Sequence, residues 1–192
     1  MENIKISEVA HLPTKFGDFM IQAFKETSSG KEHLAIFTKN LSTLDSPLIR
    51  MHSECLTGDV LGSLKCDCGE QLDFAMTKIY QEGGVILYLR QEGRNIGLLN
   101  KVNAYHLQDQ GFDTIQANIK LGFKADERDY SIADKMLKFL KIKKIRLLTN
   151  NPKKLSTLKD VEISERVPIV IKENSCNTDY LQIKKNIMGH LI

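Results

Sequence analysis

The sequence lacks any apolar segment long enough to cross a membrane as a helix. Its longest apolar runs, such as Val85 to Leu89, have about five residues, whereas a spanning helix needs about 20. The N-terminus reads Met-Glu-Asn-Ile-Lys and has no basic stretch followed by an apolar one, so a secretory signal is not expected. We therefore expect a cytoplasmic protein with no membrane partner.

Repeats, low-complexity tracts and a strong excess of one charge are also missing. The 27 basic and 24 acidic residues leave a net charge of +3, which is too small an excess to indicate non-specific nucleic-acid binding. Hydrophobic residues make up 42% and charged residues 27% of the chain, as is typical of soluble globular proteins. With 192 residues the chain can bury a core of its own, and we expect a single compact domain over residues 1–192.

The pattern of apolar residues predicts alternating strands and helices. Two short runs, Phe19 to Phe24 and Leu34 to Thr38, flank a turn-like segment and indicate a β-hairpin. Further strands are expected at 48–49, 85–89, 145–149 and 167–171, and helices at 69–81, 96–110, 131–139 and from 150 onward. In the second of these helices Leu98, Leu99 and Val102 lie near one face. The order predicts an α/β or α+β domain with a mixed β-sheet flanked by helices and an N-terminal β-hairpin region.

Three of the four cysteines are close together in the sequence. Cys55, Cys66 and Cys68 are joined by a segment with two glycines, which can return its ends to one ion. Three thiolates suit zinc and leave a fourth tetrahedral position for water, as at catalytic sites, whereas a structural site needs a fourth protein ligand. The candidates for that ligand are His52, His106 and Cys176. The spacing leaves both kinds of site open, but it disfavours disulfides, which also need an oxidising compartment.

Two strand-to-helix loops carry groups that suit an anion. The first, Arg90 to Gly97, places Arg94 at the mouth of a helix, where a guanidinium can bind phosphate oxygens or instead pair with Glu92. The second, Thr149 to Lys154, offers a hydroxyl, two amides and two lysines, which either bind a ligand or face solvent. Neither loop is a Walker A loop or a Gly-x-Gly-x-x-Gly turn.

A charged segment from Asp126 to Asp129 precedes the helix at 131–139. Its plain interpretation is a solvated turn. Alternatively, Asp126 and Arg128 lie side by side, as a carboxylate that handles protons and a guanidinium that meets phosphate. The sequence does not decide between these two interpretations.

Five motifs, taken in order, closely resemble the GTP cyclohydrolase II family. They are Arg50-Met-His-Ser-Glu-Cys-Leu-Thr-Gly-Asp59, Lys65-Cys-Asp-Cys-Gly69, Arg90-Gln-Glu-Gly-Arg-Asn-Ile-Gly-Leu98, Ala125-Asp-Glu-Arg-Asp129 and Leu148-Thr-Asn-Asn-Pro-Lys-Lys154. The resemblance extends from about Leu12 to the C-terminal segment that begins at Met188. Five motifs in the same order are far more specific than any one of them.

The resemblance implies zinc-dependent hydrolysis of GTP to a diaminopyrimidinone ribosylamine 5′-phosphate, formate and pyrophosphate, the reaction that begins riboflavin biosynthesis. It implies one zinc ion per chain on Cys55, Cys66 and Cys68, and Mg²⁺ on the triphosphate. It also implies a homodimer. The residues expected to contact GTP are Arg50, Met51, His52, Ser53, Glu54, Gln71, Glu92, Gly93, Arg94, Thr114, Thr149 and Lys154.

The resemblance also implies three catalytic residues. Tyr105 is expected close to the imidazole carbon that is hydrated, Asp126 as proton acceptor and Arg128 as nucleophile towards the α-phosphate. Because a guanidinium is protonated and has no ready lone pair, a plainer hypothesis is that Arg128 stabilises charge on the α-phosphoryl group while water attacks. Retention of Tyr105 favours the full reaction over release of a formylated intermediate.

Two other functions remain alternatives. A non-catalytic zinc module that binds nucleic acid would need a closed, four-ligand metal site and a stronger positive charge. A related hydrolase could stop at the formylated intermediate, and separate assays of formate and pyrophosphate distinguish it.

Overall fold

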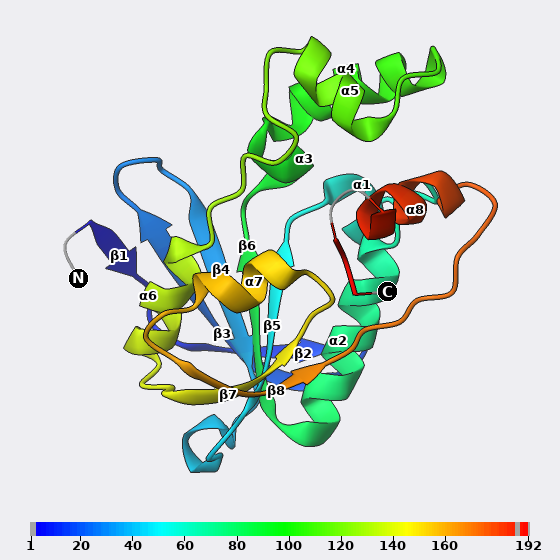
Figure 1. Cartoon of the computed structure of the whole chain (residues 1–192). Helices are drawn as coiled ribbons and strands as arrows, with labels where there is room; N and C mark the ends of the chain where they lie inside the picture. Colours follow the sequence, from blue (N-terminus) through cyan, green and yellow to red (C-terminus); the bar gives the residue numbers. More distant parts are fainter. Residues whose placement is uncertain (1–2, 187–188, 192) are drawn as a thin grey trace.

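The computed structural model describes residues 3–186 and 189–191; Met188 lies outside the described residues. Its centre is a mixed, eight-stranded sheet in the order β1-β3-β4-β6-β5-β7-β8, with β2 paired to β3 (Figure 1). The strands are β1 (Ile4–Ile6), β2 (Ala10–Thr14), β3 (Gly17–Glu26), β4 (Glu32–Phe37), β5 (Leu48–Ser53), β6 (Gly84–Leu89), β7 (Lys144–Leu148) and β8 (Glu162–Val167).

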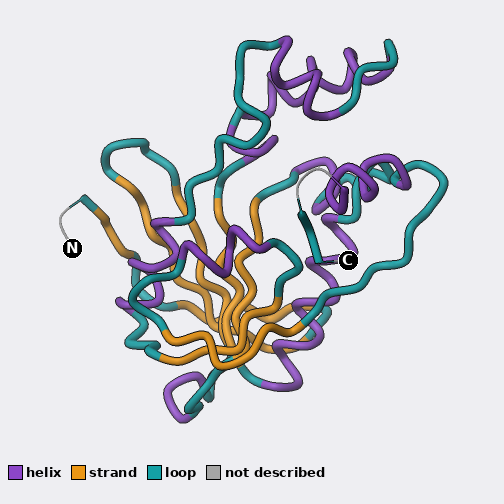
Figure 2. Tube along the Cα trace, viewed as in Figure 1, coloured by secondary structure: helices purple, strands orange, loops and turns teal. Residues whose placement is uncertain are grey.

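The helices are α1 (Leu56–Asp59), α2 (Cys68–Glu82), α3 (Glu92–Asn95), α4 (Gly97–Asp109), α5 (Thr114–Lys120), α6 (Ser131–Phe139), α7 (Pro152–Thr157) and α8 (Thr178–Asn186), and a 3₁₀ turn spans Leu41–Thr43. Figure 2 shows the helices arranged around the strands. In the described part of the chain, no helix has the length and apolar character that crossing a membrane requires.

The sheet combines an antiparallel half with a parallel half. β3 pairs antiparallel with β1, β2 and β4, and β4 pairs antiparallel with β6. β5 lies parallel to both β6 and β7, and β7 lies parallel to β8. The predicted mixed sheet and N-terminal hairpin region are therefore confirmed. The carboxyl ends of β5, β6 and β7 meet at one edge, where sites in parallel sheets usually form.

Both faces of the sheet are covered by apolar side chains. Along β6, Val85 and Leu87 belong to one buried cluster and Ile86 to the other, because successive strand residues point to opposite faces. α6 covers the first face with residues such as Met136, and α2 covers the second with residues such as Ile79. Each such side chain, when fully buried, contributes about 1.5–3 kcal/mol.

Helices α4 and α5 form an arm, residues 97–120, that projects beyond the carboxyl end of β6 (Figure 1). The sequence places apolar side chains near one face of α4. Its apolar face is exposed, with Leu99 76% accessible, and the residues it buries are Lys101 and Ala104. The apolar side chains of this helix therefore do not form part of the chain's own core.

The predicted helices at 69–81, 96–110 and 131–139 are confirmed as α2, α4 and α6. The strand expected at 167–171 is wrong, because β8 pairs with β7 over Glu162–Val167 and ends before Pro168. Proline has no N–H to donate to the sheet, so pairing stops there. Ile169, which follows, is still buried, and its packing explains the apolar pattern that suggested a strand.

Candidate active site

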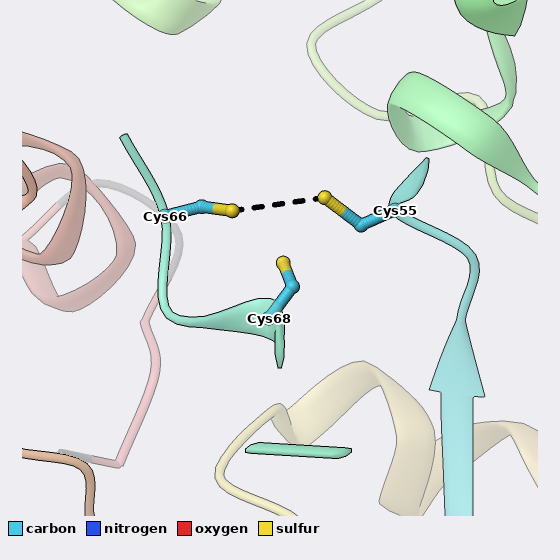
Figure 3. Close-up of side chains that lie close together, drawn as sticks. All are labelled: Cys55, Cys66 and Cys68. Atoms are coloured by element: carbon cyan, nitrogen blue, oxygen red, sulfur yellow. Dashed lines mark hydrogen bonds between the residues drawn. The ribbon is translucent and has the colours of Figure 1, made fainter. Parts of the chain in front are cut away.

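Three cysteine thiols converge on one point at the carboxyl end of β5. Cys55 lies two residues after that strand, Cys66 lies two residues before α2, and Cys68 is the first residue of α2 (Figure 3). The Sγ atoms of Cys55 and Cys66 are 3.6 Å apart, and all three sulfurs lie within 4.8 Å of one another. Tetrahedral zinc with Zn–S bonds of about 2.3 Å separates its sulfurs by about 3.8 Å, so the cluster fits this ion.

Two glycines allow the cysteines to approach one another. A Cβ atom on Gly58 would lie 2.9 Å from Cys66 Sγ and 3.0 Å from Cys68 Cβ, and one on Gly69 would lie 2.3 Å from the carbonyl oxygen of Gly58. The distances of 2.9 and 2.3 Å are shorter than real Cβ contacts, and that of 3.0 Å is tight. The glycines in the two cysteine motifs therefore keep α1 and the start of α2 in contact.

The thiols share protons unequally. Hydrogen bonds from Cys66 and Cys68 lower the pKa of the Cys55 thiol far below its usual range. The hydrogen bond to Cys55 raises the pKa of Cys66 to about 11, and the same partner, together with burial, raises that of Cys68. Because a metal binds cysteine as thiolate, binding of a metal to this cluster releases protons.

The candidates for a fourth protein ligand do not join the cluster. His52 Nε2 lies 3.0 Å from Asp59 Oδ1, while His106 is bonded to the side chain of Gln110. Cys176 is exposed. Among residues 3–186 and 189–191, the metal-type cluster comprises the three cysteines alone. This geometry favours a three-ligand site with an open position.

A buried lysine lies against the cluster. Lys101 Nζ is 3.1 Å from Cys55 Sγ and 2.7 Å from Glu92 Oε1. Burial lowers the pKa of Lys101, but the Cys55 thiolate and Glu92 outweigh burial and raise it. Glu92 therefore pairs with Lys101. The alternative in which Glu92 pairs with Arg94 is wrong, because Arg94 donates to the carbonyl of Ala125.

A cavity of about 500 Å³ opens beside the cysteines. The metal cluster forms one wall and the α4–α5 arm, through Tyr105 and Thr114, forms another. The remaining predicted site residues that line it are Ser53, Glu54, Glu92, Gly93, Arg94 and Arg128. Its size is that of a pocket for a small-molecule ligand.

A smaller cavity of about 70 Å³ adjoins the first, and Ser53, Cys68, Arg94 and Arg128 line both. The other predicted site residues that line it are Arg50, His52, Gln71, Thr149 and Lys154. Two predicted residues line neither cavity. Met51 has its side chain in the core, and its carbonyl accepts a hydrogen bond from Lys154 Nζ at 2.6 Å. Asp126 lies behind Arg128.

The smaller cavity has an excess of cationic donors. Arg50 is 5% exposed and donates to Gln71 and to the carbonyl of Leu148, yet its Nε has no hydrogen-bond partner. The NH2 atom of Arg94 is also buried without a partner. Burial lowers the pKa of Arg50 because desolvation disfavours the charged form. Buried donors of this kind need an acceptor, and a phosphate oxygen provides one.

The two lysines of the loop from Thr149 to Lys154 differ in their exposure to solvent. Asn151 caps α7 by accepting a hydrogen bond from the Lys153 N–H, as its position before a proline predicts. Lys154 is buried in the cavity wall, whereas Lys153 is exposed, with its Nζ 3.6 Å from Asp126 Oδ2. Of the two lysines, Lys154 alone lines the cavity.

Asp126 and Arg128 lie side by side. Arg128 Nε and NH2 donate to the two carboxylate oxygens of Asp126 at 2.8 Å each. Burial raises the pKa of Asp126, but the hydrogen bonds and charge of Arg128 outweigh burial and lower it to about 2. The alternative of a solvated turn is therefore wrong for this pair, whose side chains are largely buried.

Tyr105 places its hydroxyl 3.1 Å from Thr57 Oγ1, in the wall between the cysteines and the arm. Burial raises the pKa of this phenol, so it is protonated at neutral pH. A neutral phenol can donate a hydrogen bond or a proton to a ligand in the larger cavity.

Sequence reasoning missed Lys101 and Asp59. Asp59 is buried and binds His52, the hydroxyl of Tyr88 at 2.8 Å and the N–H of Cys55 at 3.0 Å. A signal for Lys101 was present, because it precedes Tyr105 by four residues and therefore shares its face of the helix. No comparable spacing singles out Asp59.

A thiolate cluster beside a cationic cavity in an α/β domain defines a metal-dependent enzyme site for a phosphorylated ligand. The sequence profile of GTP cyclohydrolase II matches residues 5–168. The chain belongs to this family.

Its relatives share its full length. A protein named GTP cyclohydrolase-2 from Campylobacter hominis is 60% identical over 190 residues, which cover 99% of this chain and 96% of the relative. One of the same name from Helicobacter pylori is 56% identical, with complete coverage of both chains. Among solved structures, a two-domain 3,4-dihydroxy-2-butanone 4-phosphate synthase from A. baumannii has a TM-score of 0.50 at 15% identity. The match covers 90% of this chain and 41% of that one, and shows a shared fold alone.

Proposed function

We propose that this chain hydrolyses GTP to a diaminopyrimidinone ribosylamine 5′-phosphate, formate and pyrophosphate, as a zinc-dependent enzyme of riboflavin biosynthesis. The observation that carries the proposal is the junction of two cavities, one beside three cysteine thiols and the other lined by buried cationic donors without partners. Family membership supports the same reaction.

Cys55, Cys66 and Cys68 would hold the zinc ion, since their sulfurs have the separation that tetrahedral zinc requires. When bound, zinc supplies a Lewis acid and lowers the pKa of water, which is the chemistry that opening an imidazole ring and removing a formyl group need. Cys176, which lines the larger cavity, would not hold the metal. Because all four cysteines are free, a reducing compartment such as the cytoplasm suits the chain.

The triphosphate would occupy the smaller cavity. Arg50 and Arg94 would donate to its oxygens through Nε and NH2, and Lys154 and Thr149 lie in the same wall. Mg²⁺ would neutralise part of the phosphate charge while pyrophosphate leaves. The guanine and ribose would then lie in the larger cavity, against Glu54, Glu92, Gly93 and Thr114. Of the remaining predicted contacts, Ser53 lines both cavities, His52 and Gln71 line the smaller one, and Met51 would take part by its backbone.

Arg128 would stabilise charge on the α-phosphoryl group. Its guanidinium is protonated and is held by both oxygens of Asp126, which orients it and leaves it without a lone pair for attack. Asp126, with a pKa of about 2, would keep the arginine in place and accept a proton only transiently. Tyr105 would donate a hydrogen bond beside the ring carbon that is hydrated.

The chain would act as a single domain and as a homodimer. Leu98, Leu99 and Val102 are exposed on α4, and an apolar helix face of this kind is typical of a surface that a second copy covers. Leu99→Glu is expected to shift the chain to a monomer in sedimentation velocity, and an unchanged dimer would contradict this use of α4. Neither nucleic acid nor a membrane is expected as a partner.

Formate and pyrophosphate release from GTP tests the reaction. With Mg²⁺ and zinc, the intact chain is expected to release both products in equal amounts, and Cys66→Ser to release neither. The matched control is Cys176→Ser, which replaces a thiol that lines the larger cavity but lies outside the cluster, and which is expected to bind zinc as tightly as the intact chain. Pyrophosphate without formate would indicate a product that keeps its formyl group. Absence of both products would refute the proposal.

A further inference from the structure

Lys101 lines the larger cavity, and its buried ammonium group also contacts a cysteine of the metal cluster, a contact that is not made to the ligand. Lys101 is 8% exposed, a rare state for lysine, and its Nζ points at Cys55 Sγ over 3.1 Å. Three thiolates on a zinc ion carry a net charge of −1, and Cys55 and Cys66 are themselves buried. A buried negative charge is costly unless a positive group or hydrogen bonds compensate it.

The surroundings of Lys101 fix its ammonium group in this position. Glu92 Oε1 accepts a hydrogen bond from Nζ at 2.7 Å, and the same carboxylate accepts from the N–H groups of Leu56 and Gly93 at 2.6 and 2.8 Å. An ammonium has three donors, so the bond to Glu92 leaves Lys101 able to donate to sulfur as well. Gly93, which has a positive φ, leaves room for the lysine stem. A Cβ atom added to this glycine would lie 3.0 Å from Lys101 Cβ.

Other nearby cations do not make this contact. Lys65 lies beside Cys66 in the sequence, but its Nζ is bonded to Asp109 and its side chain is 43% exposed. Lys154 is buried like Lys101, yet its Nζ donates to the carbonyl of Met51. Among the described residues, Lys101 is the lysine whose ammonium group hydrogen-bonds to a cysteine sulfur.

We propose that Lys101 is a positioning residue of the metal centre, whose ammonium group donates a charge-assisted hydrogen bond to the thiolate of Cys55 and so strengthens zinc binding. Glu92 orients this ammonium group and is therefore part of the metal environment as well as of the predicted GTP site. Replacement of a residue that hydrogen-bonds to a metal ligand typically lowers the metal affinity 10- to 100-fold.

Zinc affinity, measured by competition with a chromophoric chelator, tests the inference without any assay of activity. Lys101→Met removes both the charge and the donor, and Lys101→Gln keeps a donor without the charge. Both are expected to weaken zinc binding by about 10- to 100-fold. Lys154→Met is the matched control, since it removes a buried lysine that does not touch sulfur, and its zinc affinity should equal that of the unmodified chain. If either Lys101 variant binds zinc as tightly as the unmodified chain, the inference is wrong.

A second measurement keeps the inference testable if the variants do not fold. In the unmodified chain loaded with cadmium-113 and labelled with nitrogen-15 at lysine, scalar coupling is expected between the metal and the Lys101 ammonium protons through the N–H···S bond. A resolved Lys101 signal without coupling would overturn the inference. The inference rests on the proposed zinc site, but the two fail differently: an unmodified chain that binds no zinc refutes the site itself.

Discussion

Replacement of Asp126 by asparagine tests the ion pair that orients Arg128. The pKa of Asp126 lies at about 2, against 3.8 for an unperturbed aspartate. This difference corresponds to about 2 kcal/mol of folding free energy at neutral pH. The side chain is 4% exposed, so solvent screens the pair little. We therefore expect Asp126→Asn to lower the free energy of unfolding at pH 7 by about 2 kcal/mol.

The dependence on pH separates this effect from a simple loss of packing. Because the folded-state pKa is lowered, the contribution is fully present above pH 3.8 and is lost as the pH falls towards 2. Asparagine does not titrate, so the difference between the two proteins should be constant from pH 7 to 5 and shrink below about pH 4. Urea denaturation at several pH values measures it, with the exposed Asp45→Asn as control. A difference that is absent at pH 7, or unchanged at pH 3, would refute the argument.

Three further changes have defined outcomes. Gly58→Ala should weaken zinc binding about 10- to 100-fold in chelator competition, because overpacking against Cys66 costs about 1–3 kcal/mol; unchanged affinity would contradict the tight packing. Lys154→Met should raise the KM for GTP about 10- to 100-fold through the loss of a charged hydrogen-bond donor, and an unchanged KM would remove Lys154 from the triphosphate site. Tyr105→Phe should slow formate release about 100-fold in a stopped assay, and undiminished formate release would exclude the phenol from the hydrolytic steps.

Much of the fold could be predicted from local patterns. The spacing of Ala75, Met76 and Ile79 predicts α2, and the glycine pair after it marks its end, since Gly83 adopts a positive φ. Strand order could not be predicted, because it depends on pairing between distant segments, such as Leu48 of β5 with Arg146 of β7. Pro168 should have limited the last strand, but the apolar residues that follow it outweighed that signal.

The site was less predictable than the fold. The spacing of Cys55, Cys66 and Cys68 pointed to a metal, and the structure brings their sulfurs together. The role of Lys101 on α4 was not predicted, because its burial depends on Glu92 and a cysteine thiolate and not on the apolar pattern of its own helix. Such a pairing joins three separate segments. The four-residue spacing from Tyr105 places Lys101 on the same helix face but does not reveal its partners.

Zinc on the three cysteines is proposed to lie beside the larger cavity, which holds the guanine, while the triphosphate lies in the adjoining smaller cavity. A crystal structure of the zinc-loaded chain with a non-hydrolysable GTP analogue, with anomalous data at the zinc edge, tests it most directly. We expect one anomalous peak, from a zinc ion bound to Cys55, Cys66 and Cys68. Phosphate oxygens are expected to accept hydrogen bonds from Arg50 Nε and from Arg128. Zinc with a fourth protein ligand, or a triphosphate bound away from Arg50, would contradict it.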